Sequence, residues 1–559
     1  MSWNIIKKYR SILFSERGAT LKNWGGKLPV CLVYPNRYRI AMSNLGFQAV
    51  YMLLNAQPDI LCERAFLPDP EELKEYAKSA TPLLSLESQR PLSDFAVIAF
   101  SVSFESDYLN IPKIFRLAGI PPFAAERSDT QPLVIAGGAA LFLNPEPVAE
   151  FMDLVCIGEA EALLPDLLTL LREEGMERKR LLEDAARISG IYVPAFYEVS
   201  YNGPRVETIR VMPGIPSRVT RGWAKELDRH VTTSAIFTPE TEFSDMFLIE
   251  LSRGCPRGCR FCAAGFIYRP YRQRSLASVK ATVDIGLAKH QRLGLVGAAI
   301  SDYRGIGELS RYIIEQGGKV SVSSLRIDGL DSDLINVLKA SGHKTVALAP
   351  EGGSQRLRDM IKKELSTEQI ISACDRLIKS DILNLKLYFI IGLPTETMTD
   401  LEEMVTMVME IRERVIAAAR AKGRLGEITL SINPFVPKPF TPFQWCAMEE
   451  VKSLEGKIRF LQQAIGRLAN VRMISESPRD AYLQALLSRG DRRLAGLLVR
   501  AAELGNWRKG AKEIGMETDQ LVYRNIPLDE TLPWEVIDSG DKNLLVREYR
   551  KAFLPPPLS

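Results

Sequence analysis

Three of the eight cysteines in the 559-residue chain form a CxxxCxxC array: Cys255, Cys259 and Cys262. Glycine and proline separate the first two thiols. Thiolates at this spacing on a tight loop can hold three irons of a four-iron cluster, which leaves one iron without a protein ligand. An open metal position suits catalysis, whereas structural zinc normally takes four protein ligands. A zinc loop and three coincidental core cysteines are the alternatives.

Histidine is scarce in the chain, with only three residues, and the first of them is His230. The other five cysteines are scattered along the sequence, at Cys31, Cys62, Cys156, Cys374 and Cys446. We therefore expect one cluster site and no auxiliary cluster, because the remaining cysteines and the histidines form no second group in the sequence.

The composition is that of an ordinary globular protein. Lys and Arg total 72 against 68 Asp and Glu, which gives a net charge of +4, and hydrophobic residues make up 46%. These values argue against disorder and against nucleic-acid binding by bulk charge. No apolar run approaches the ~20 residues of a membrane span, and charged residues interrupt the N-terminal positions where a secretory signal needs an apolar core. We expect no membrane-spanning helix and a cytoplasmic location.

The length predicts three or four domains, at about 150 residues per domain. Residues 1–200 alternate short apolar runs with helical patterns, which is typical of a parallel sheet with crossover helices. The predicted strands are residues 30–34, 96–102, 133–136 and 154–157, and the predicted helices are residues 43–54 and 108–117. The sequence therefore predicts an N-terminal Rossmann-like α/β domain. Residues 201–245, which are rich in turn formers, are a linker or an accessory hairpin.

A second alternation of strands and helices covers residues 246–445. Six strands are predicted, at residues 247–251, 296–300, 319–323, 345–349, 384–391 and 427–432. Gly294 is interpreted as the stop signal of the preceding helix. This α/β pattern predicts a six-stranded partial (β/α) barrel, and residues 446–559 are predicted to form a mainly helical C-terminal region.

Polar residues and glycines follow the predicted barrel strands. Ser301 and Asp302 come after the second strand, Glu351 and Gly352 after the fourth, and Gly392 after the fifth. Ligands of such barrels bind where the strands end. A carboxylate such as Glu351 can accept from an ammonium group or a ribose hydroxyl, and glycine lets a ligand approach the backbone. A capped helix start is the alternative for each segment.

The array, with Phe261 before its third cysteine and a strand before its first, resembles the radical S-adenosylmethionine (SAM) superfamily. The resemblance implies that the three cysteines bind a 4Fe-4S cluster and that Phe261 approaches adenine. It also implies that the open iron holds SAM, which is cleaved to a 5′-deoxyadenosyl radical after reduction by an external donor such as flavodoxin or ferredoxin. Segments similar to those around Glu351–Gly352 and Gly392 lie near SAM in some branches. Ser301 and Asp302 stand where the superfamily has Gly-Gly-Glu, so the ligand of the methionine ammonium stays open.

The N-terminal domain is similar to the cobalamin-binding domain of one branch of this superfamily. The similarity rests on a glycine pair, a Pro-Glu turn and a Gly-Glu-x-Glu segment, and it extends over nearly the whole chain to an uncharacterised fused family. It implies cobalamin contacts near the strand ends, for which the candidates are Ser43, Gly46, Ser103, Gly137 and Gly138. No histidine precedes His230, so this domain cannot give cobalt an imidazole. A scaffolding domain without cobalamin is the alternative.

Three functions are consistent with these features. The first is cobalamin-dependent methylation of an unactivated carbon by a radical SAM enzyme. The second is a cobalamin-independent radical modification of RNA or a peptide, for which Arg-rich helices give weak support. The third is a non-catalytic, metal-stabilised binding module. The sequence identifies neither the substrate nor a catalytic residue.

Overall fold

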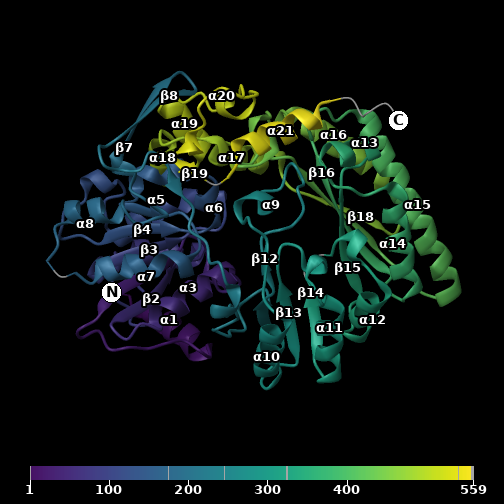
Figure 1. The fold of residues 1–559 in the computed structure, drawn as a ribbon, viewed down its shortest axis with the longest axis horizontal. Coiled ribbons are helices and arrows are strands. Elements are labelled where there is room, and N and C mark those ends of the chain that lie inside the picture. The colour runs from purple at the N-terminus through teal and green to yellow at the C-terminus, as the bar shows by residue number, and fades with distance from the viewer. Residues whose placement is uncertain (1, 174, 244–245, 323–324, 539, 555–559) are drawn as a thin grey trace. The chain divides into compact units, whose positions relative to one another are not determined.

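The computed structural model describes residues 2–173, 175–243, 246–322, 325–538 and 540–554 (Figure 1). The chain packs into two compact units. Unit 1 comprises Met1–Asp245, Leu486–Leu521 and Asp529–Ser539, and unit 2 comprises Met246–Ala485, Val522–Leu528 and Gly540–Ser559. The predicted C-terminal region therefore supplies segments to both units. No helix among the described residues is long and apolar enough to cross a membrane.

Unit 1 contains a six-stranded sheet in the order β2-β1-β3-β4-β5-β6. The first five strands in sequence pair in parallel, and β6 is antiparallel to β5. Their bounds are β1 Leu28–Tyr34, β2 Ile60–Phe66, β3 Val97–Ser101, β4 Leu133–Gly137, β5 Leu154–Cys156 and β6 Ile191–Tyr192. The order 2-1-3-4-5 is that of a doubly wound sheet, whose ligands bind where the order reverses, between β1 and β3. The predicted Rossmann-like sheet is confirmed.

The helices of unit 1 include α3 (Leu45–Asn55), α5 (Ile111–Ala118) and α7 (Ala160–Leu171). The hairpin of β7 (Tyr197–Asn202) and β8 (Arg205–Val211) turns at Gly203, which has a positive φ of 58°. This turn lies in the turn-rich stretch of the sequence. A short hairpin needs a residue with a positive φ at its turn, and glycine adopts one readily.

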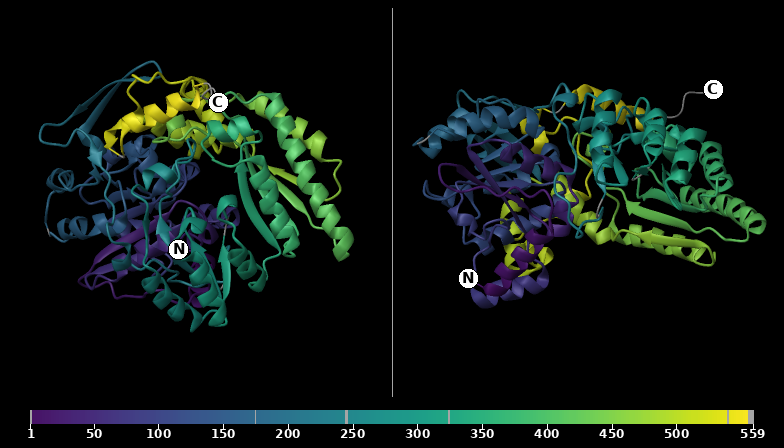
Figure 2. Two further views of the ribbon diagram at one scale, coloured as in Figure 1. Left: turned by 45° about the vertical axis from the view of Figure 1, so that its right-hand side comes forward. Right: turned by 90° about the horizontal axis from the view of Figure 1, so that it is seen from below.

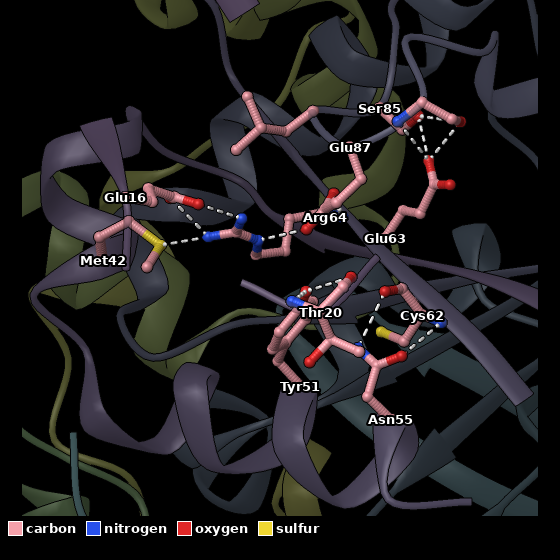
Figure 3. A network of polar contacts seen from close by, with 12 residues as sticks. Glu16, Thr20, Met42, Tyr51, Asn55, Cys62, Glu63, Arg64, Ser85 and Glu87 are labelled. Atoms are coloured by element: carbon pink, nitrogen blue, oxygen red, sulfur yellow. Dashed lines mark hydrogen bonds and ion pairs between the residues drawn. The ribbon is translucent and has the colours of Figure 1, made fainter. Parts of the chain in front are cut away.

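A buried ion network explains why β2 lies inside the protein despite its charged residues (Figure 3). Arg64 Nε lies 2.7 Å from Glu87 Oε1, and its Nη2 lies 2.6 Å from Glu16 Oε2. All three side chains are at most 2% exposed. The Arg64 guanidinium also lies 4.9 Å from the ring centroid of Tyr51. The network therefore fastens the segments around residues 16 and 87 to β2, because a buried charge requires its partners.

The C-terminal segment of unit 1 covers the segment that follows β4. Its helix α18 (Leu494–Leu504) packs against α5. Asn144 Nδ2, after β4, donates to the carbonyls of Ser488 (3.1 Å) and Gly490 (2.7 Å). Arg492 Nε lies 2.8 Å from Glu146 Oε2. This part of the sheet edge is therefore occupied by the chain itself.

The described residues of unit 2 form seven parallel strands in a three-stranded and a four-stranded sheet, β10-β13-β14 and β15-β16-β17-β18. An isolated parallel bridge between Leu325 and Leu348 joins the two. The bounds are β10 Phe247–Glu250, β13 Arg292–Val296, β14 Lys319–Val322, β15 Thr345–Glu351, β16 Asn384–Ile391, β17 Ile428–Pro434 and β18 Val471–Ser475. Figure 2 shows the helices of this unit lying along one side of its strands.

The helices between these strands have the bounds α10 Leu276–Leu287, α11 Ile306–Glu315, α12 Ser332–Ala340, α14 Thr367–Lys379, α15 Met398–Lys422 and α16 Val451–Ile465. The partial barrel is confirmed, with two corrections. The second predicted strand, residues 296–300, is wrong: β13 ends at Val296, and Ile300–Asp302 forms a 3₁₀ turn. Gly294 lies within β13 and is not a helix stop. Glycine is needed at this position because a Cβ would lie 2.5 Å from the Leu248 side chain.

The second correction concerns the number of strands, seven where the sequence predicts six. The additional strand, β18, is mostly exposed, and among the described residues it pairs with β17 alone. Such an edge strand lacks the continuous apolar run by which the other strands are recognised. Ser323, the last residue of the third predicted strand, lies outside the described residues.

Candidate functional site

The cysteine loop follows β10 and is closed by a short hairpin. Its strands are β11 (Ser252–Arg253) and β12 (Arg272–Gln273), and α9 (Ala264–Ile267) lies between them. Gly254, just before the first cysteine, has a φ of 81°. A Cβ at this glycine would lie 2.7 Å from the carbonyl oxygen of Tyr268. Only glycine therefore lets the chain turn sharply here.

The three thiols of the loop are free. Cys259 is buried, and Cys255 and Cys262 are partly exposed. Burial raises the pKa of Cys255, and burial together with the charge of Cys259 raises the pKa of Cys262 to about 11. Thiolates in such surroundings need positive charge nearby, which bound metal supplies.

The donor set of the loop fits an iron–sulfur cluster, since it offers three unpaired thiols on one tight loop. In the structure the three thiols are not arranged closely enough to hold a metal ion. Among the described residues, no group of three or more His, Cys, Asp or Glu side chains has such an arrangement.

Ser301 and Asp302, which the sequence places after the second strand, lie beside the cysteine loop. Asp302 Oδ1 lies 2.5 Å from Nη2 of Arg257, the residue between the first two cysteines. Ser301 Oγ accepts from the backbone N–H of Arg326, at 3.2 Å. Arg326 Nε in turn lies 3.0 Å from Asp328 Oδ1. Asp302 therefore pairs with the cysteine loop, whereas Ser301 contacts the segment around Arg326. The role of both residues toward SAM stays a prediction.

Glu351 ends β15 in a left-handed conformation, with a φ of 66°. Such a backbone is uncommon for a residue other than glycine and is often found at functional sites. Its charge contributes to the raised pKa of Cys262, after burial and the charges of Cys259 and Cys255, which contribute more. Its Oε1 lies 3.3 Å from Nζ of Lys363. The contact of Glu351 with SAM stays a prediction.

Other parts of the chain lie close to Gly352 and Gly392, the two glycines predicted to admit a ligand. A Cβ at Gly352 would lie 3.0 Å from the backbone nitrogen of Arg358, in α13 (Gln355–Met360). Gly392 has a φ of 72°, and its N–H donates to Glu396 Oε1 at 2.8 Å. Close packing therefore accounts for Gly352, whereas Gly392 lines a pocket at the end of β16.

Phe261 and the C-terminal helix α21 (Lys542–Ala552) meet at one hydrophobic cluster. Phe261 packs against its buried members, which include Leu357, Met360, Ile390, Leu393, Phe435, Phe443, Cys446 and Ala552. Arg260, between two cysteines, has its Nη2 3.2 Å from Glu548 Oε2 and donates from Nη1 to the Met360 carbonyl at 2.7 Å. The sequence gives no signal for the pairing of Arg260 with Glu548, because these residues are 288 positions apart.

We expect Glu548→Gln to loosen the cysteine loop. The change removes the charge that pairs with the buried Arg260 guanidinium, at an expected cost of about 1.5–3 kcal/mol. Iron bound after anaerobic reconstitution should fall, and the unfolding midpoint should fall with it. Glu410→Gln, which breaks an exposed pair with Arg414, is the control. Wild-type iron content in Glu548→Gln would show that α21 does not position the loop.

The candidate residues of unit 1 lie at or after the ends of three strands, β1, β3 and β4. Ser43 and Gly46 follow β1, and Ser103 follows β3, where its Oγ accepts from Asn44 Nδ2 at 2.9 Å. These residues lie where the strand order reverses. Gly137 and Gly138 end β4, and a Cβ at Gly138 would lie 2.3 Å from the Val102 carbonyl oxygen. Backbone packing therefore explains Gly138 without a ligand.

Three residues that the sequence did not single out, Tyr34, Asn36 and Asp107, lie at the same reversal. Asn36 Nδ2 donates to Asp107 Oδ1 at 2.7 Å. Tyr34 Oη and Asp107 Oδ2 are buried, and neither has a hydrogen-bond partner in the described part of the chain. Burial raises the pKa of Asp107 to about 7. Unpaired buried polar atoms at a switch point are what a ligand-binding edge would present.

Asp107 should make unit 1 less stable as the pH rises. Its pKa is about 7 in the folded protein, well above that of an unfolded aspartate, so folding takes up a proton between these values. Stability is then lost from about pH 4 to about pH 7, by about 4 kcal/mol, because each pKa unit corresponds to about 1.4 kcal/mol. Asp107→Asn should flatten this part of the unfolding profile, measured by urea titration at several pH values. An unchanged slope would contradict the assignment.

Two family models match the chain. The model described as "Radical SAM superfamily" matches residues 249–408, and that described as "Radical SAM proteins, N-terminal" matches residues 46–194. An uncharacterized protein of Methanocaldococcus jannaschii is 29% identical over 89% of this chain and 98% of its own length. The anaerobic magnesium-protoporphyrin IX monomethyl ester cyclase of Rubrivivax gelatinosus is 24% identical over 54% of this chain and 52% of its own length.

Among solved structures, the cobalamin-dependent S-adenosylmethionine radical enzyme OxsB aligns with a TM-score of 0.45 and 16% identity. The alignment covers 68% of this chain and 52% of OxsB. The chain thus spans about half the length of OxsB and of the cyclase, and nearly all of the archaeal relative.

Proposed function

Because the chain is a radical SAM enzyme with the N-terminal domain of such proteins, we propose that it binds a 4Fe-4S cluster through Cys255, Cys259 and Cys262. The observation that carries this proposal is the set of three free thiols on one glycine-turned loop after β10. A reduced cluster held by these thiols would supply the one electron for cleavage of SAM at its C5′–S bond, with methionine and, after hydrogen is taken from the substrate, 5′-deoxyadenosine as the products. A flavodoxin- or ferredoxin-type donor supplies that electron.

The chain's own residues position this chemistry. Arg257 fastens the cysteine loop to Asp302 on one side, and Arg260 fastens it to Glu548 on the other. Glu351, at the end of β15, would accept from the ammonium group or a ribose hydroxyl of SAM. These contacts hold the loop in place before SAM arrives, which lowers the cost of ordering it.

The open face of the sheet is the surface on which we place the substrate. Along β16, Leu385 and Leu387 are fully buried, whereas Lys386 and Tyr388 between them are partly exposed. This alternation shows that one face is covered and the other is not. The partly exposed face is polar, and a substrate with hydrogen-bonding groups fits it.

Our finer proposal is that unit 1 binds cobalamin and that the product is a methylated carbon. The doubly wound order and the unpaired atoms of Tyr34 and Asp107 at its reversal support this placement. Cobalamin would supply the methyl group. Ser43, Asn44 and Ser103 at the same reversal would contact it, and no histidine precedes His230 to reach cobalt.

Modification of RNA is less well supported than the carbon methylation. The proposed basic helices include Arg492 and Arg493, which pair with Glu146 and Asp491 within unit 1. Arg489 is 2% exposed. These arginines therefore serve the packing of unit 1 and do not form a free basic face.

The test is anaerobic purification followed by quantification of iron, sulfide and cobalamin in the same sample. We expect about four irons and four sulfides per chain and cobalamin that survives gel filtration. A protein with the cluster but no retained cobalamin would remove the methyl-transfer proposal and leave the radical enzyme. A protein that holds one zinc and no sulfide would overturn both.

A further inference from the structure

A pocket of about 810 Å³ lies at the carboxyl end of β16 in unit 2. The segment after β16, the residues before α16, and the helices α16 and α21 form its walls. Tyr549 and Phe553 make its aromatic side, with ring centroids 4.9 Å apart. Ser453, Gly456 and Lys457 line it from one face of α16. This volume is of the size that proteins use for small-molecule ligands.

The charges in the pocket do not balance. Lys457 Nζ lies 2.8 Å from Glu396 Oε1 and 2.6 Å from Glu449 Oε2, so one ammonium serves two carboxylates. Burial lowers the pKa of Lys457, but the charges of these two glutamates outweigh it and leave the pKa raised. Burial raises the pKa of Glu396, and Lys457 opposes this shift. With both glutamates ionised the three groups carry one net negative charge, which favours binding of a cation.

Glu396 has an acceptor that nothing in the described part of the chain satisfies. Its side chain is fully buried, at 0% exposure, and its Oε1 accepts from Gly392 N–H and from Lys457. Its Oε2 is buried without a hydrogen-bond partner. Because an unpaired buried acceptor costs free energy, a ligand N–H at this oxygen would stabilise the pocket.

The pocket is separate from the cysteine loop. None of the three cysteines of the array lines it, and neither does Glu351. Leu393 and Cys446 belong both to its wall and to the hydrophobic cluster against which Phe261 packs. A ligand here would therefore contact none of the three array cysteines, although Gly392, whose segment the resemblance places near SAM in some branches, lines the pocket.

We propose that this pocket binds a small organic amine. Its ammonium group donates to the free oxygen of Glu396 and is neutralised by Glu396 and Glu449. Its apolar part packs against the rings of Tyr549 and Phe553. The inference goes beyond the proposed radical chemistry and does not depend on it, since no residue of the cysteine loop takes part.

The experiment is isothermal titration of the purified full-length chain with three matched probes. They are 2-phenylethylamine, the neutral 2-phenylethanol and the anionic 3-phenylpropanoate. The variants are Glu396→Gln and Glu449→Gln, and Glu410→Gln on the exposed side of α15 is the matched control. Glutamine keeps the shape of Glu396 and can still accept from Gly392 and Lys457, and Glu449 is partly exposed, so at least one variant should fold.

We expect the amine to bind at least about tenfold more tightly than the alcohol or the carboxylate, because its contact is charge-assisted. Glu396→Gln and Glu449→Gln should each weaken the amine by at least about tenfold, while Glu410→Gln leaves it unchanged. Equal binding of the three probes, no binding of the amine, or wild-type affinity in both pocket variants would each overturn the proposal. Iron content of the same samples reports separately on the proposed function.

Discussion

Replacing Cys255, Cys259 or Cys262 singly by alanine should abolish formation of 5′-deoxyadenosine from SAM under reduction. Each change removes one of three thiols on the loop, and no other cysteine or histidine is placed to replace it among the described residues. Changing a residue that contacts a metal ligand typically lowers metal affinity or activity by about 10–100-fold. Removing a cysteine that binds the cluster directly should have a larger effect, so we expect activity to fall by more than about a hundredfold. The product is measured by chromatography after anaerobic reaction with dithionite.

The control for this prediction is Cys374→Ala. Cys374 is a buried cysteine of α14 in the same unit, and its loss creates only a small cavity. It should retain iron and activity. Activity near that of the wild type in any of the three loop variants would show that the loop does not hold the cluster.

The second large effect is expected at the buried ion network of unit 1 (Figure 3). Arg64→Ala leaves Glu16 and Glu87 buried without their cation, and burial already raises the pKa of Glu87. Removing one member of a buried ion network typically costs about 3–5 kcal/mol. The free energy of unfolding, measured by urea titration, should fall by this amount.

Two comparisons make this prediction specific. Arg172→Ala breaks a more exposed pair with Asp59 and should cost less than about 1 kcal/mol. Replacing Arg64, Glu16 and Glu87 together by Met, Leu and Leu should recover most of the lost stability, since no charge is then left unpaired. A cost at Arg64 no larger than at Arg172 would mean that the network does not fasten β2.

The local features of the site could be predicted from the sequence because they depend on neighbouring residues. The cysteine spacing predicts a metal loop, and the apolar run of residues 384–391 coincides with β16. The sequence places a strand at residues 296–300 because Gly294 resembles a helix stop. In the structure Gly294 lies inside β13, where the Leu248 side chain leaves no room for a Cβ. The seventh strand was missed because a mostly exposed edge strand has little apolar signal.

Contacts between distant segments could not be predicted. Arg260 meets Glu548 across 288 positions, and Asn144 meets Ser488 across 344. A buried arginine looks like a surface charge in a single sequence, because its partner is fixed only by the fold. For the same reason the unpaired oxygens of Asp107 and Glu396 emerge only once their neighbours are known.

The central claim is that the cysteine loop supports radical cleavage of SAM. The most direct measurement is the yield of 5′-deoxyadenosine and methionine from SAM by the reconstituted wild-type chain under anaerobic reduction. The account predicts equal amounts of both products, and none without iron and sulfide. A fully reconstituted protein that binds SAM and forms no 5′-deoxyadenosine would contradict it.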